Sequence, residues 1–301
     1  MIKQLTLNFG VHMPIHGLYD FEAFLETSII ADGLGYDYVT VGDHFFLSPE
    51  FYRRAGGDPD RPDKLDAWVA LAALAAETKA VKIGTRVSPL PFYLPARLAK
   101  MVATVDIISG GRALLGAGAG AYRDEAVAYG VGWGRHRERI DRMIEEIEII
   151  LKLWTEDRTT FKGKYYSVLD APFWPKPIQK PHPPIWFGGS SNAIVEATAK
   201  YGEGVFPFPN MPPERLEDLN NRLRKAESKQ GRKGRAVLAP SLSYPDGIGR
   251  TPSQWLDNVE SHVKIGSSLL FVDLSSRPVL PEKAQDFLRD FAHNVFPTFK
   301  A

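Results

Sequence analysis

The stretch VKIGTRVSPLPFYLPARLAKMVATVDIISGGRALLGAGAG, residues 81–120, contains a complete strand–helix–strand unit. Residues 81–90 form a β-type apolar run, and residues 95–109 have the spacing of an amphipathic helix with proline in its first turn. Residues 112–120 form a second apolar run that ends in alternating glycines. This order of elements is typical of parallel α/β sheets.

The same order continues along the whole chain. Helices are predicted at 20–34, 65–79 and 135–154, and helical stretches also separate the later strands. Eight such units predict a (β/α)8 TIM barrel. A doubly wound sheet is the alternative, but it usually carries a glycine-rich phosphate loop after its first strand, and FGVHMPIHG is not glycine-rich. The other predicted strands are 5–13, 36–42, 183–189, 203–209, 235–244 and 267–276.

No change in composition divides the chain, so we expect a single TIM-barrel domain over residues 1–301. The segment from about 155 to 182 is rich in proline and lysine. We interpret it as an insertion between units four and five, with a small hairpin at FKGKYYSV.

The composition excludes several classes of function. A net charge of +1 provides no field for binding nucleic acid or an anionic membrane. The absence of cysteine excludes disulfides, thiolate metal sites and cysteine nucleophiles. The N-terminus lacks the apolar core of a signal peptide, and no apolar run is long enough to span a bilayer. We therefore expect a cytoplasmic protein.

The residues that follow the strands should build the active site, because TIM barrels place it at the carboxyl ends of their strands. Glycine, aromatic and hydroxyl residues are plentiful there, and strong nucleophiles are few. This lining suits a flat organic ring with a phosphate tail better than it suits hydrolysis. The polar residues in question include His12 and His16 after strand one, Asp43 and His44 after strand two, and Asp273, Ser275 and Arg277 after strand eight.

FGGSSNAIVE (187–196) is the best candidate for a phosphate site. Gly188 and Gly189 let the backbone approach an anion, and Ser190 and Ser191 offer hydroxyl donors at the start of a helix. The alternative is that the serines only cap this helix.

The glycine-rich end of strand four, LLGAGAGAYRDE (114–125), has two interpretations. A planar ligand could lie against bare backbone at Ala119 and Gly120, with Tyr122 at the rim. Close packing of the strand against a helix would require the same glycines.

Asp43 and His44 could form an acid–base pair, contribute to a metal site, or satisfy each other internally. Asp43 would then orient the His44 imidazole, although adjacent strand residues point to opposite faces. His12 could be a pocket residue or a buried histidine bonded to the backbone. The aromatic residues at strand ends could line a substrate pocket or belong to the core; they include Phe46, Phe92, Phe206 and Phe208.

Several of these stretches resemble the luciferase-like flavin monooxygenase superfamily. DHFF after strand two, residues 81–131, and KPIQKPHPPIWFGGSSNAIVEATAKYGEGVF (176–206) are similar to its shared stretches. The resemblance implies a barrel with an insertion and a flavin-type ring bound at the strand ends. One branch of the superfamily uses FMNH2, supplied by a separate reductase, and inserts oxygen from O2. The other branch uses the deazaflavin coenzyme F420 and transfers a hydride.

The resemblance also implies roles for individual residues. Ser190 and Ser191 would hold the cofactor phosphate, and His44 would lie near the reacting edge of the ring. The end of strand three, Arg86, Val87 and Ser88, would support the ring from behind. In the superfamily this strand end contains a cis peptide bond that does not precede proline, which places it here between Arg86 and Val87.

This sequence departs from the deazaflavin-dependent sugar-phosphate dehydrogenases in two places. They carry an acidic residue directly after the glycines of strand four, where this chain has Ala121. They also carry a tryptophan shortly after the strand-two histidine, where this chain has FFLSPE. Their substrate and proton-transfer pair are therefore not transferred.

The leading hypothesis is a coenzyme F420-dependent oxidoreductase that acts on a small organic molecule, and that forms a homodimer. The alternative is an FMNH2-dependent monooxygenase. A separate flavin or F420 reductase is an expected partner. Two other hypotheses are a metal-dependent barrel hydrolase using His12, Asp43, His44 and Asp273, and a flavin-binding barrel without turnover. The leading hypothesis includes no metal.

Overall fold

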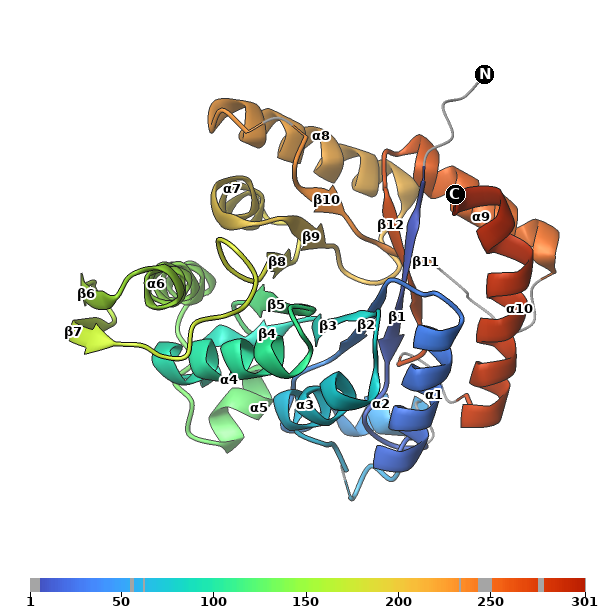
Figure 1. The fold of residues 1–301 in the computed structure, drawn as a ribbon, viewed down its shortest axis with the longest axis horizontal. Helices are drawn as coiled ribbons and strands as arrows, with labels where there is room; N and C mark the ends of the chain where they lie inside the picture. The colour runs from blue at the N-terminus through green and yellow to red at the C-terminus, as the bar shows by residue number, and fades with distance from the viewer. Residues whose placement is uncertain are drawn as a thin grey trace.

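The fold is a parallel β-barrel surrounded by helices (Figure 1). The computed structural model describes residues 6–54, 57–61, 63–232, 234–242, 251–275 and 279–300. Around the barrel the strands follow the order β10-β9-β8-β5-β3-β2-β1-β12-β11, with β4 beside β5. The strands are β1 (Asn8–Met13), β2 (Tyr38–Val41), β3 (Lys82–Thr85), β4 (Ser88–Pro89), β5 (Ala113–Gly118), β8 (Ile185–Gly188), β9 (Gly204–Phe206), β10 (Val237–Leu238), β11 (Ser241–Leu242) and β12 (Leu269–Asp273).

Two of the eight predicted strands are divided, and one division closes the barrel. β10 pairs with β9, whereas β11 pairs with β12 on the other side. Between them the Ala239 amide donates to the carbonyl of Val205 at 3.0 Å, and the Phe271 amide donates to the carbonyl of Pro240 at 2.9 Å. Proline has no amide hydrogen, so the ladder changes partner at this point. The predicted strand end at 243–244 lies outside the described residues.

The second division separates β3 from β4 at Arg86 and Val87. The peptide bond between these residues is cis, which confirms the bond predicted from the superfamily resemblance. β3 pairs with β5 through Ile83 and Gly84, and β4 pairs with β5 again further along through Ser88. Arg86 and Val87 lie between these two pairings, so their side chains can point into the barrel interior and toward its carboxyl end.

The main helices agree with their predicted bounds to within two residues. Asp20 and Asp66 begin α1 and α3, because their carboxylates accept from amides in the first turn. Three short elements, α2, α5 and the 3-10 turn η1, follow strands at the carboxyl end of the barrel and were not predicted. In the described chain, no helix combines the length and apolar character needed to cross a membrane. The helices are α1 (Phe21–Gly33), α2 (Pro49–Arg54), α3 (Ala67–Glu77), η1 (Leu90–Phe92), α4 (Pro95–Ile108), α5 (Arg123–Ala128), α6 (His136–Thr155), α7 (Asn192–Tyr201), α8 (Pro213–Lys229), α9 (Pro252–Lys264) and α10 (Pro281–Phe299).

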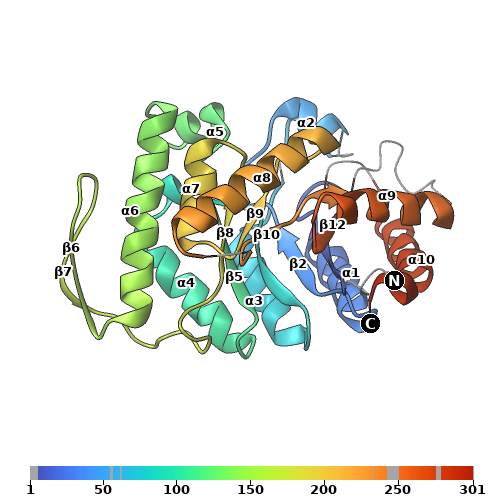
Figure 2. The same cartoon turned by 90° about the horizontal axis from the view of Figure 1, so that it is seen from above.

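The segment interpreted as an insertion contains an antiparallel hairpin, β6 (Arg158–Lys162) and β7 (Ser167–Pro172). It pairs with no barrel strand among the described residues, and it stands on the far side of α6 from the barrel (Figures 1 and 2). The hairpin at FKGKYYSV is thus confirmed, while its origin as an insertion stays a prediction.

The core has two parts, as alternation of side chains along the strands requires. Inside the barrel, aromatic and aliphatic side chains from successive strands pack together. A larger apolar layer lies between the outer face of the strands and the helices. The interior cluster consists of Tyr38, Leu114, Trp186, Phe206, Ala239, Leu269 and Phe271.

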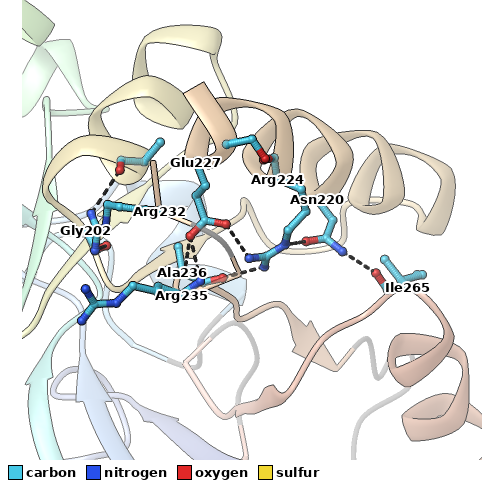
Figure 3. A network of polar contacts seen from close by, with 10 residues as sticks. Gly202, Asn220, Arg224, Glu227, Arg232, Arg235, Ala236 and Ile265 are labelled. Atoms are coloured by element: carbon cyan, nitrogen blue, oxygen red, sulfur yellow. Dashed lines mark hydrogen bonds and ion pairs between the residues drawn. The ribbon is translucent and has the colours of Figure 1, made fainter. Parts of the chain in front are cut away.

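A polar network at the end of α8 fixes the start of β10 (Figure 3). The fully buried Glu227 carboxylate accepts from the backbone amides of Arg235 and Ala236, at 3.0 and 2.7 Å, and from the Arg224 guanidinium at 2.6 Å. Arg224 also donates to the carbonyl of Ala236. These contacts lie before β10, at the opposite end from the strand carboxyl termini, so we assign them to stability.

Replacement of Glu227 with alanine should destabilise the protein, because two buried amides lose their acceptor. Each unpaired buried group costs about 1–3 kcal/mol, so we expect the free energy of unfolding in urea to fall by roughly 2–6 kcal/mol. Glu217→Ala, at an exposed position of the same helix, is the control. Equal unfolding midpoints for the two variants would contradict the assignment.

Candidate functional site

A cavity of about 390 Å³ opens at the carboxyl ends of the barrel strands. Its size lies within the range of small-molecule sites. Most residues singled out in the sequence line it, although they come from strands far apart in the chain. These residues are His12, His44, Arg86, Val87, Ala119, Gly120, Tyr122, Gly188, Gly189, Ser190, Ser191, Phe206 and Phe208.

Asp43 and Ser88 do not reach the cavity and instead support its wall. The buried Asp43 carboxylate accepts from Ser88 Oγ at 2.5 Å and from the Tyr93 hydroxyl at 2.8 Å. Trp68 Nε1 donates to Ser88 Oγ at 3.0 Å. Burial raises the pKa of Asp43, although the hydrogen bonds from Ser88 and Tyr93 oppose this. The expectation that Asp43 orients the His44 imidazole is therefore wrong, because its carboxylate bonds to Ser88 and Tyr93 while His44 Nδ1 pairs with Glu125.

Two of the predicted pocket aromatics also lie outside the cavity lining. The Phe92 ring stacks on Phe45 with centroids 5.8 Å apart, and the Phe46 ring lies 6.0 Å from Tyr129. Phe45 and Tyr129 are in turn 4.5 Å apart. These four rings form a separate cluster beside α5, partly exposed to solvent.

Glu125 on α5 provides the carboxylate that orients His44. His44 Nδ1 lies 2.8 Å from Glu125 Oε2, and the Phe45 amide donates to Glu125 Oε1 at 2.5 Å. Since a carboxylate only accepts, this contact places a proton on Nδ1 and leaves Nε2 to exchange a proton with a bound molecule. The Tyr122 ring meets the imidazole edge-on at 5.1 Å. Sequence reasoning missed Glu125, although it lies only four residues beyond Ala121.

The glycines at the ends of β5 and β8 make room for Val87. A Cβ at Gly118 would lie 2.5 Å from a Val87 methyl group, and one at Gly188 would lie 2.9 Å from the same group. At Gly116 a Cβ would lie 1.9 Å from the carbonyl oxygen of Thr85. Gly116 and Gly118 therefore allow close packing against the neighbouring β3–β4 segment, not against a helix as expected, and Gly118, Ala119 and Gly120 also line the cavity.

The GGSS turn caps α7 and also lines the cavity. Ser191 Oγ accepts from the Ile194 amide at 3.4 Å and caps α7, while Ser190 and Ser191 both line the cavity. Gly189 has a φ of +121°, which L side chains rarely adopt. Arg222 on α8 donates to the carbonyl of Ser190 at 3.0 Å and so holds the turn in place. The contribution of Arg222 left no signal in the local sequence.

A group of ionisable side chains lines the opposite side of the cavity, near β1 and β12. Burial lowers the pKa of His12 to about 4 and that of His16 to about 3. Burial also lowers the pKa of Lys64 to about 8 and that of Arg86 to about 10. Both histidines are therefore neutral at pH 7, while Arg86 and most of Lys64 carry positive charge.

Asp273 at the end of β12 supplies the negative charge in this group. Burial would raise its pKa, but His12, Arg86 and two hydrogen bonds from Ser275 outweigh burial and lower it. Lys64 joins the group because its segment bridges to His16 ahead of α3. Sequence reasoning missed Lys64, which follows no strand. Arg277 lies outside the described residues.

Metal ligands do not gather in this cavity. In the parts of the chain that the structure describes, no three or more His, Asp or Glu side chains are arranged to hold a metal ion. The hydrolase hypothesis therefore gains no support from the geometry.

The chain is similar in sequence to several known enzymes. The sequence profile described as luciferase-like monooxygenase matches residues 6–283. The chain is 37% identical over 210 residues to an F420-dependent glucose-6-phosphate dehydrogenase of Microbacterium testaceum, covering 69% of this chain and 59% of that protein. It is 33% identical over 165 residues to an FMNH2-dependent dimethylsulfone monooxygenase of Pseudomonas putida, covering 55% of this chain and 44% of that protein.

A solved structure of an F420-dependent secondary alcohol dehydrogenase has the same fold, with a TM-score of 0.83 at 19% identity, covering 98% of this chain and all of that one. The chain spans about half to two thirds of the length of the first curated relatives it matches.

His16 should make the protein acid-sensitive. Its pKa of about 3 lies below the unfolded value of 6.5, so the unfolded state binds the proton more readily and stability falls as pH drops below 6.5. Between pH 7 and 5 this loss amounts to about 2 kcal/mol. His16→Phe should reduce the measured loss of unfolding free energy over this interval by a similar amount. An unchanged loss would show that His16 does not remain neutral in the folded protein.

Proposed function

Because the chain belongs to the luciferase-like monooxygenase family, we propose that it is an oxidoreductase that uses coenzyme F420 to exchange a hydride with a small organic substrate. One observation carries the proposal: His44, which Glu125 orients, and the GGSS turn line a single cavity. Similarity to several F420-dependent glucose-6-phosphate dehydrogenases favours the deazaflavin over FMN.

The residues that line the cavity fit such a cofactor. Ser190 and the first turn of α7 would bind its phosphate, because amides at a helix N-terminus attract anions. Val87, Ala119 and Gly120 would support the flat ring. The bound deazaflavin supplies the acceptor or donor of the hydride.

His44 would move the proton that accompanies the hydride. When an alcohol is oxidised, its hydroxyl proton passes to His44 Nε2 as the hydride leaves the carbon, and the reverse occurs in reduction. The Glu125 carboxylate on Nδ1 stabilises the imidazolium form and holds the ring in place. The short distance of this pair, 2.8 Å, supports that division of roles.

The second candidate is an FMNH2-dependent monooxygenase, and the dimethylsulfone monooxygenase relative favours it. This reaction would require a separate flavin reductase to supply the reduced cofactor. The deazaflavin route would instead need only a partner enzyme that recycles the coenzyme.

We propose in addition that the chain is a single domain, since β1 near its start pairs with β12 near its end. A homodimer in the cytoplasm is also proposed. Exposed apolar side chains on the early helices support a dimer, namely Phe21, Ile29 and Val69.

Titration with each cofactor tests the proposal. We expect the protein to bind coenzyme F420 more tightly than FMN, measured by the fluorescence of the cofactor. Ser190→Ala removes a donor to the phosphate, and a hydrogen bond to a charged group is worth about 1.5–3 kcal/mol. Affinity should therefore fall at least tenfold, whereas Ser228→Ala, outside the cavity lining, should leave it unchanged. Tighter binding of FMN, with oxygen-dependent turnover, would reverse the choice of cofactor.

His44→Asn should lower turnover about 100-fold, which is a typical contribution of a general acid–base. Cofactor affinity should change little, because the phosphate lies at another side of the cavity. Glu125→Gln should reduce turnover less, since the amide oxygen still accepts from Nδ1. The control is His293→Asn at an exposed position of α10. If His44→Asn weakened cofactor binding as much as it slowed turnover, the proton-transfer role would be wrong.

A further inference from the structure

The cavity wall contains a cation with unused hydrogen-bonding capacity. Arg86 lines the cavity, and its guanidinium lies between Phe206, which ends β9, and Phe271 in β12. Its Nη1 and Nη2 atoms are buried, and no acceptor among the described residues reaches them.

Aromatic rings hold the faces of this guanidinium. The Arg86 Cζ atom lies 5.2 Å from the centroid of Phe206 and 4.9 Å from that of Phe271. These cation–π contacts stabilise the charge but do not satisfy its N–H groups. A buried charged donor without an acceptor is costly, so the edge of the guanidinium is suited to an anion that enters the cavity.

The shape of the guanidinium favours a planar anion. Arg86 interacts with the Asp273 carboxylate, and Lys64 interacts with the carboxylates of Asp43 and Glu125. His12 bonds through Nδ1 to the Thr40 hydroxyl at 3.1 Å, and burial keeps it neutral at pH 7. The planar fork of donors on Arg86 matches the two oxygens of a carboxylate.

We propose that the substrate is a small carboxylic acid and that Arg86 binds its carboxylate group. This inference rests on the proposed function, because it assigns the region around Arg86 to the substrate and the GGSS region to the cofactor. The substrate thus enters with its anionic group toward β1 and β12 and its reacting carbon toward His44.

The reacting carbon should be close to the carboxylate. A Cβ placed on Gly42 would lie 4.0 Å from both His12 Nε2 and His44 Cδ2, so the two imidazoles border the same small space. His12 lines the Arg86 region, and His44 is the proposed acid–base. A substrate with a hydroxyl or carbonyl group within a few atoms of its carboxylate, as in 2-hydroxy acids, reaches Arg86 and His44 at the same time.

The test compares lactate with its neutral amide, lactamide, on the wild-type protein loaded with coenzyme F420. Lactate should perturb the cofactor fluorescence or be oxidised with a kcat/KM at least tenfold above that of lactamide. Equal responses to the acid and the amide would overturn the proposal without requiring any variant.

Substitution of Arg86 tests whether its guanidinium causes the preference for lactate. Arg86→Met should weaken lactate binding at least tenfold while changing the affinity for coenzyme F420 less than threefold, and Arg86→Lys should restore part of the loss. Arg289→Met, on exposed α10, is the control. An equal loss of cofactor affinity in Arg86→Met would assign the guanidinium to the cofactor and overturn the proposal.

Calorimetric titration of lactate into cofactor-free protein separates this inference from the proposed function. Arg86-dependent binding of lactate without any binding of coenzyme F420 would support the carboxylate site while rejecting the F420 assignment. Binding of coenzyme F420 at the GGSS turn, with equal responses to lactate and lactamide, would support the F420 assignment and reject the carboxylate site.

Discussion

The packing of Val87 against the glycines of β5 and β8 determines the shape of the site. One of its methyl groups occupies the space where side chains at Gly118 and Gly188 would begin, so both positions require glycine. On one side of this contact the cavity is lined by Val87 itself and by small residues. On the other side, Arg86 extends into the barrel between two aromatic rings. A larger residue at either glycine would displace Val87 and alter both sides together.

This arrangement gives the cavity two ends of different chemistry. At the α7 end, hydroxyls and helix amides can bind an anion, and Arg222 holds the turn from behind. The proposed second anion-binding group is the guanidinium of Arg86, which lies between Phe206 and Phe271. His44, which Glu125 orients, lines the same cavity. The polarity of the cavity therefore suggests how a cofactor and a substrate could bind without competing for the same anion site.

The repeating strand-then-helix pattern was sufficient to predict the barrel, because the hydrophobic period of each element is a local property of the chain. The position of the GGSS turn at the site could also be predicted from local sequence, because two glycines and two serines directly precede a predicted helix. Glu125 was not found, because its contact with His44 joins residues 81 positions apart through a short helix that no pattern predicted. The orientation of Asp43 followed from strand alternation alone, and the structure agrees with that rule rather than with a direct Asp43–His44 pair.

A crystal structure of the complex with coenzyme F420 tests the assignment of the two ends most directly. We predict electron density for the phosphate beside Ser190 and the first turn of α7, and for the ring against Val87. No atom of the cofactor should contact the Arg86 guanidinium. Density for the phosphate on Arg86 and Lys64, with the GGSS turn empty, would contradict it.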